Sequence, residues 1–105
     1  MSTRKSFAFA SILSLMIPAV TYAADGAALY KAKCASCHGA DGSGMTPMGK
    51  AMKLRDLSSA AVQKQSDAEL TKVTADGKGK MPAYKGKMTD AEIAAVVAHI
   101  RSMKK

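Results

Sequence analysis

Cys34-Ala35-Ser36-Cys37-His38 is the segment from which the rest of this chain can be interpreted. The pattern C-x-x-C-H is the attachment sequence of c-type haem. Two thiols add to the haem vinyl groups as thioethers, and the adjacent histidine ligates the iron through an imidazole nitrogen. The segment therefore predicts one covalently attached haem c, bonded to Cys34 and Cys37, with His38 as a ligand of the iron.

Other interpretations of the cysteine pair are open at this point. A bare C-x-x-C pair occurs in thioredoxin-like redox proteins, but no βαβ pattern surrounds this one. Half of a zinc site is a second alternative, although the chain has no second cysteine pair and His99 is its only other histidine. A haem-free thiol protein, with its two cysteines free or bridged, is the third.

The segment 1–23 has the features of a secretory signal peptide. Arg4 and Lys5 make its start positive, Phe7–Ile17 is apolar, and small residues suited to cleavage follow. The apolar run is too short for a membrane span, which needs about 20 residues. We therefore expect export to the periplasm, cleavage that leaves residues 24–105 as one domain, and no stable insertion into a membrane.

The predicted domain is small and has few aromatic residues. Cleavage after residue 23 leaves 82 residues, in which Tyr30 and Tyr84 are the only aromatic side chains. A domain of this size buries a modest core, so it needs a further source of apolar surface. A haem supplies that surface, and we expect the haem-free chain to fold poorly, as small metal domains do without their metal.

The charge of the chain indicates its partners. After cleavage, 14 Lys and Arg residues face 8 acidic residues, which is a net charge of +6. Most of these cations are single lysines that serve as solvated surface, but together they favour association with an acidic redox partner protein. No basic block with interleaved aromatic residues is present, so nucleic acid is not an expected partner. We expect a monomer.

The residue pattern predicts helices and no strands. Asp25 can cap a first helix that ends near Lys33, and a short helix follows Ser58 or Ser59. The Ser66–Glu69 and Thr89–Glu92 segments are capping boxes, which predict helices to about Ala75 and Met103. Ile93, Val96, Val97 and Ile100 form an apolar stripe on the last helix. Loops are expected at 39–49 and 77–84, and 48–57 is ambiguous.

The second iron ligand is less certain from the residues alone. Met81 is the favoured candidate because it lies in an irregular loop and is followed by Pro82, which biases it toward an extended conformation. His99 is the bis-histidine alternative. The other methionines are further alternatives, although the Met45, Met48 and Met52 stripe is more often core lining than ligand: Met45, Met48, Met52, Met88 and Met103.

These features together resemble the class I c-type cytochromes, and most of all their short bacterial and photosynthetic members. The resemblance covers nearly all of 24–105 and rests on four features: Cys34–His38, the Gly26 and Tyr30 spacing, Met81-Pro82, and the Ile93–Ile100 helix. It implies an all-α cytochrome c fold of three to five helices around one haem. It also implies that the first and last helices cross, with Gly26 and Tyr30 against the Val96–Ile100 stripe.

The resemblance extends to individual residues. It implies that Cys34 and Cys37 carry the haem, that His38 is the proximal ligand and that Met81 is the distal ligand. It also implies that the carbonyl of Pro47 holds the imidazole of His38. One residue departs from the family, because an aromatic side chain usually occupies the position of His99, and this puts the tightness of the helix crossing in question.

A soluble one-electron carrier is the function that these residues favour. With His38 and Met81 both on iron, no coordination site is open to a substrate, and methionine raises the reduction potential relative to a second histidine. The sequence contains no Ser-His-Asp set, paired carboxylates or phosphate loop, so an enzyme is not expected. The alternatives are a haem subunit of a larger oxidoreductase, or a sensor of gases or peroxide with a labile distal ligand.

Overall fold

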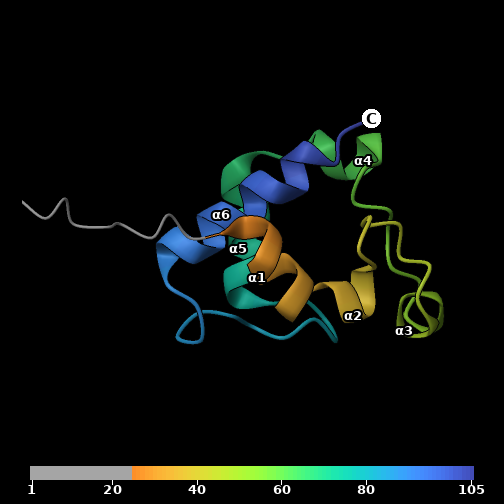
Figure 1. The fold of residues 1–105 in the computed structure, drawn as a ribbon, viewed down its shortest axis with the longest axis horizontal. Helices are drawn as coiled ribbons and strands as arrows, with labels where there is room; N and C mark the ends of the chain where they lie inside the picture. The colour runs from red at the N-terminus through yellow and green to blue at the C-terminus, as the bar shows by residue number, and fades with distance from the viewer. Residues whose placement is uncertain (1–24) are drawn as a thin grey trace, which may run out of the picture.

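The computed structural model describes residues 25–105, so the expected signal peptide lies outside the described residues. Six helices are present in this part of the chain, and together they enclose one core: α1 Gly26–Lys33, α2 Ala35–His38, α3 Pro47–Ala51, α4 Ala60–Gln63, α5 Asp67–Asp76 and α6 Asp90–Ser102. Figure 1 shows α1 and α6 crossing near the centre of the molecule, with α3 at one end beside α2.

The predicted crossing of the first and last helices is confirmed and is close. A Cβ atom on Gly26 would lie 2.1 Å from the carbonyl oxygen of Ala95, so only glycine allows this approach. One turn later, Tyr30 is 1% exposed and packs in the same core as Val96, Val97 and Ile100. His99 does not loosen the contact, since its ring lies 5.1 Å from that of Tyr30 at a tilt of 49°.

The predicted helix starts are confirmed by their capping bonds. Asp25, Ser66 and Thr89 each accept a hydrogen bond from the backbone N–H three residues later, which satisfies one of the free donors of a helix start. At Thr89 the carboxylate of Glu92 also accepts from the Thr89 N–H, so the capping box is complete. Local sequence therefore determines where α1, α5 and α6 begin.

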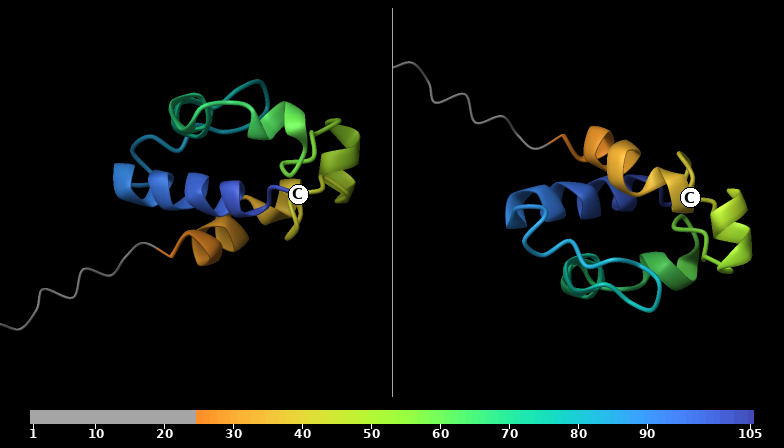
Figure 2. Two further views of the ribbon diagram at one scale, coloured as in Figure 1. Left: turned by 90° about the horizontal axis from the view of Figure 1, so that it is seen from above. Right: turned by 90° about the horizontal axis from the view of Figure 1, so that it is seen from below.

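The segment from α4 to the end of the loop after α5 covers the side of α6 opposite to α1 (Figure 2). Arg101 on α6 connects these two layers. Its guanidinium donates to Asp67 Oδ1 at 2.7 Å, to the carbonyl of Gln63 at 2.7 Å and to the carbonyl of Gln65. Gln63 in turn donates to the carbonyl of Ile100 at 2.9 Å. No pattern in the sequence indicated this contact, because its partners lie more than 30 residues away from Arg101.

Two sequence predictions on the 39–57 region are wrong. The loop expected at 39–49 ends at Thr46, because Thr46 caps α3 and Pro47 occupies its first turn, where a missing N–H costs nothing. The stripe of Met45, Met48 and Met52 does not line the core, since Met45 is 67% and Met48 is 52% exposed. Single-turn helices such as α2 and α3 also raise the helix number above the expected three to five.

The described residues form no strand, only isolated bridges between Lys78 and Met81 and between Lys85 and Met88. The fold is therefore all-α, as predicted. Among residues 25–105, no helix is long and apolar enough to cross a membrane.

Candidate haem-binding site

A cavity of about 490 Å³ opens beside α2, and a second cavity of about 370 Å³ continues it toward the core. Both volumes fall in the range typical of ligand sites. Three of the four predicted site residues, Cys34, His38 and Met81, line both cavities, and Cys37 lines the larger one. The fold thus brings together residues 34–38 and residue 81, which are far apart in the sequence.

The two cysteines lie at the end of α1 and within α2. Cys34 ends α1 and also precedes the first residue of α2, and both thiols are half-buried. In the described part of the chain the two thiols do not form a disulfide. Burial raises the pKa of the Cys34 thiol, and the neighbouring Cys37 raises it further. A raised pKa disfavours the thiolate, so Cys34 does not have the activated thiol of a thioredoxin-like site.

His38 has the properties of a residue placed to bind a partner in the cavity. Its Nδ1 atom is buried and has no hydrogen-bond partner among the described residues. Buried polar atoms are nearly always paired, so an unpaired buried nitrogen on a residue that lines a cavity indicates a ligand at this site. Burial also lowers the pKa of His38, which favours the neutral imidazole that ligates metal. These properties fit a haem.

The expected contact from Pro47 to His38 is absent. Because Nδ1 of His38 has no partner, the carbonyl of Pro47 does not accept a hydrogen bond from it. Pro47 instead begins α3 and is itself exposed. The local preference of proline for the first turn of a helix accounts for this placement.

Met81 is held by a tight turn. Its N–H donates to the carbonyl of Lys78 at 3.0 Å, and the N–H of Lys78 donates back to the carbonyl of Met81 at 3.2 Å. Gly77 allows this turn, since a Cβ atom there would lie 2.6 Å from the Met81 carbonyl oxygen. Of the alternatives, Met52 lines the larger cavity, whereas Met88 is 6% exposed in the core. Met52 is therefore the nearest competitor.

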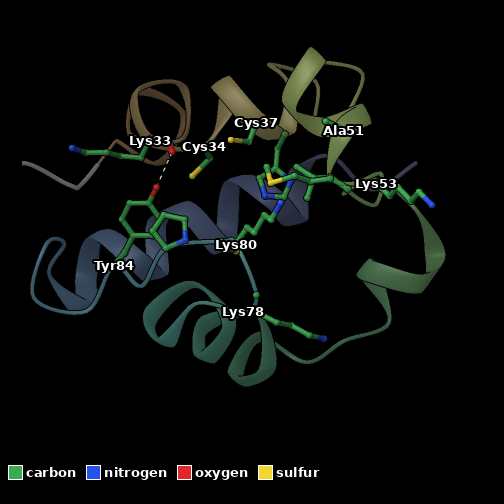
Figure 3. Close-up of a pocket in the computed structure, with 14 residues that line it drawn as sticks. Lys33, Cys34, Cys37, Ala51, Lys53, Lys78, Lys80 and Tyr84 are labelled. Atoms are coloured by element: carbon green, nitrogen blue, oxygen red, sulfur yellow. Dashed lines mark hydrogen bonds between the residues drawn. The ribbon is translucent and has the colours of Figure 1, made fainter.

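Tyr84 is a wall residue that sequence analysis did not identify. Its hydroxyl donates to the carbonyl of Lys33 at 2.9 Å, which joins the loop after α5 to the end of α1 (Figure 3). In Figure 3, Cys34 and Cys37 lie on one wall and Tyr84 and Lys80 on the facing side. The only sequence signal for this role was that Tyr84 is one of two aromatic residues outside the segment 1–23.

The rim of the cavities is positively charged. Among the described residues, those that line the cavities include five cationic side chains and no carboxylate: Lys33, Lys53, Arg55, Lys78 and Lys80. All five are exposed, and Figure 3 shows Lys33, Lys53 and Lys78 extending away from the cavity. Lys53 also adopts a left-handed backbone conformation with φ of 53°. This edge of the molecule therefore attracts anionic groups.

Tyr30→Phe is expected to lower the free energy of unfolding by about 1 kcal/mol, because the Tyr30 hydroxyl donates to the carbonyl of Gly39 at 2.6 Å. Burial, with smaller effects of Cys34 and Asp41, raises the pKa of Tyr30 above its usual value near 10. The stabilisation is therefore complete below about pH 10 and is lost as the pH rises further.

Denaturant titrations of the wild-type protein and Tyr30→Phe at pH 7 and above pH 10 test this expectation. The difference in free energy of unfolding between the two proteins should shrink at the higher pH, because only the wild-type protein has the Tyr30 hydroxyl to ionise. The lysines titrate in both proteins, so their effects cancel in this difference. A difference that is constant with pH would show that the Tyr30 hydroxyl does not contribute in this way.

The fold and the site together define a small helical protein with a partly apolar, cation-rimmed cavity for a prosthetic group. The family profile described as cytochrome c oxidase, cbb3-type, subunit III matches residues 21–100. Cytochrome c6 of Leptolyngbya boryana is 37% identical over 78 residues, which are 74% of this chain and 88% of that protein.

Solved structures agree with these matches. The KustC0563 c-type cytochrome superposes with a TM-score of 0.72 at 35% identity, and covers 77% of this chain and 99% of its own. Cytochrome c6C of Synechococcus sp. PCC 7002 gives a TM-score of 0.61 at 30% identity, over 76% of this chain and 94% of its own. The chain belongs to the cytochrome c family and is a small class I monohaem c-type cytochrome with one covalently attached haem c.

Proposed function

We propose that this cytochrome is an exported one-electron carrier, with haem bonded to Cys34 and Cys37 and with iron between His38 and Met81. The observation that carries the proposal is that His38 and Met81, 43 positions apart, line the same two cavities with the cysteines. The relatives called cytochrome c6 are of the same size class and support the assignment.

The haem supplies an iron that changes between ferric and ferrous states. The protein residues hold the proposed ligands in place, so that little rearrangement accompanies the change of oxidation state. His38 is presented by the short helix α2, and the reciprocal bonds between Lys78 and Met81 hold the thioether loop closed. Two ligands held by the protein leave no position for a substrate and keep the site similar in both states. These properties favour electron transfer and do not favour an enzyme.

The proposed redox partner is an acidic protein. Five cationic side chains and no carboxylate line the cavities, so an acidic surface would approach at this edge. Charge complementarity of this kind raises the association rate more than the affinity, which suits a transient carrier. We expect the cytochrome to act as a monomer in such encounters.

The proposed location is the periplasm. A signal peptide at residues 1–23 would direct residues 24–105 out of the cytoplasm as one cytochrome c domain. Attachment of haem to a C-x-x-C-H segment outside the cytoplasm is consistent with this route.

A second candidate, the haem subunit of a larger oxidoreductase, is favoured by the exposure of two methionines. Met45 is 67% and Met48 is 52% exposed, and a partner subunit would remove this apolar surface from water. The family profile that matches the chain also carries the name of an oxidase subunit. Sedimentation of the purified holoprotein distinguishes the candidates: a stable complex that survives purification from the native host favours the subunit, and a monomer favours the carrier.

Met81→Ala is expected to abolish the weak far-red absorption band that arises from a sulfur-to-iron bond in the ferric protein. The variant should also bind carbon monoxide readily when reduced, because an iron position becomes free. The wild-type protein should show the band and bind carbon monoxide poorly. Absorption spectra of both proteins in both oxidation states, produced with haem-attachment machinery, give the answer.

Met52→Leu is the matched control, because Met52 also lines the larger cavity. This variant should keep the far-red band. A band that is lost in Met52→Leu and kept in Met81→Ala would assign the sulfur ligand to Met52. A wild-type protein without the band, and with open access to carbon monoxide, would favour a sensor.

A further inference from the structure

Three consecutive carbonyl oxygens at the end of α2 accept hydrogen bonds from outside that helix. The last carbonyls of a helix have no partner within it, so they need such donors. The three bonds are Thr46 Oγ1 to Cys37 at 2.5 Å, Gly44 N to His38 at 2.8 Å and Tyr30 Oη to Gly39 at 2.6 Å. The backbone that presents His38 is thus held by α1 and by the loop that precedes α3.

Thr46 is the residue in this set whose side chain has two functions. Its hydroxyl donates to the carbonyl of Cys37 and accepts from the N–H of Gly49 at 2.8 Å, which caps α3. The start of α3 lies close to the same carbonyl. A Cβ atom on Gly49 would be only 2.7 Å from the Cys37 oxygen, so glycine is needed there. The Thr46 hydroxyl therefore joins α3 to the haem-attachment turn at their closest point.

The imidazole of His38 has no comparable restraint of its own. Its Nδ1 atom has no partner in the part of the chain that the structure describes, and Pro47 does not supply one. No hydrogen bond from Nδ1 to a described residue therefore fixes the ring directly, and the bonds that hold its backbone contribute to its placement.

We propose that Thr46 is a positioning residue for the proximal ligand, which fixes the orientation of the His38 imidazole by its hydrogen bond to the Cys37 carbonyl. The inference rests on the proposed ligation of iron by His38. In this proposal the Thr46 hydroxyl restrains the His38 ring as a hydrogen-bond donor to the Cys37 carbonyl. Its second role, as the cap of α3, does not supply this restraint.

The test compares three variants of the holoprotein that separate these two roles. Thr46→Val removes both the donor and the cap. Thr46→Asp keeps an acceptor for the Gly49 N–H but, as a carboxylate, cannot donate to the Cys37 carbonyl. Thr46→Ser keeps both functions. Proton NMR of the ferric protein is the readout, because the pattern of the shifted haem-methyl resonances depends on the orientation of the axial ligands around the iron.

Thr46→Val and Thr46→Asp should each change the order or spread of the haem-methyl resonances, and Thr46→Ser should restore the wild-type pattern. Thr89→Val is the matched control, since Thr89 caps α6 by the same geometry without contact to the attachment turn. It should lower thermal stability and leave the haem-methyl pattern unchanged. A pattern that is unchanged in both Thr46→Val and Thr46→Asp would overturn the proposal.

If Thr46→Val and Thr46→Asp yield no holoprotein, the exchange of the Thr46 hydroxyl proton in the wild-type protein tests the bond on which the proposal depends. A slowly exchanging hydroxyl proton on Thr46 supports the bond to Cys37, and a rapidly exchanging one overturns it. The proposed function fails separately, because the absorption spectra of the wild-type protein, Met81→Ala and Met52→Leu show which methionine binds the iron before any variant at Thr46 is made.

Discussion

Replacement of both Cys34 and Cys37 by serine is expected to remove covalently attached haem completely and to leave a chain without a cooperative unfolding transition. Serine cannot form the thioethers, and the cavities that it would still line, about 490 and 370 Å³, lie next to the core. Among residues 25–105, only eight hydrophobic side chains are buried in that core, so the haem surface is a large part of what the fold can bury.

Haem staining after denaturing electrophoresis and circular dichroism during thermal unfolding measure the two effects. Ser36→Ala is the matched control within the same turn, because Ser36 is exposed and its hydroxyl makes only a weak contact with the Cys37 sulfur at 4.0 Å. This control should attach haem and unfold like the wild-type protein. A haem-free double variant with a sharp, native-like transition would show that the polypeptide core is sufficient by itself.

Gly26→Val is expected to destabilise the holoprotein by about 3 kcal/mol or more, at the upper end of the effects of overpacking. The new Cβ atom would lie 2.1 Å from the carbonyl oxygen of Ala95 and 2.7 Å from its carbonyl carbon. These are backbone atoms, so no side-chain rotation relieves the clash, and α1 must move away from α6. That movement also opens the contacts of Tyr30 with the core.

The midpoint of denaturant unfolding, followed by the haem absorption, measures this loss. Ala27→Val is the matched control, because it places the same side chain at the next, exposed position of α1. Its effect should stay near the few tenths of a kcal/mol expected from the lower helix propensity of valine. Equal effects of the two substitutions would contradict the assignment of Gly26 to a close crossing.

The proposed haem ligands differ in how well the sequence identified them. Cys34, Cys37 and His38 lie within five consecutive residues, so one short pattern identifies all three. Met81 could be favoured only from its loop and its family resemblance, and the structure adds that it shares two cavities with His38. Met45 and Met48 show why methionine spacing alone is a poor guide, because both project into solvent.

Local residue patterns predict the features that depend on neighbouring residues. The caps at Asp25, Ser66 and Thr89 are side-chain bonds to an N–H three residues away, so their positions follow directly from the local pattern. The apolar stripe of α6 likewise follows from helical periodicity. The close approach at Gly26 was expected from the family resemblance, which implied that the first and last helices cross there.

Contacts between distant segments were decided only by the tertiary structure. Arg101 reaches three groups on α5 and the segment before it, Tyr84 closes the cavity against Lys33, and Thr46 supports the turn in which Pro47 was expected to act. Each of these bonds joins groups that approach only after the helices have packed. The sequence therefore specifies the haem-attachment turn and the helix starts, whereas the packed chain determines which groups hold that turn in place.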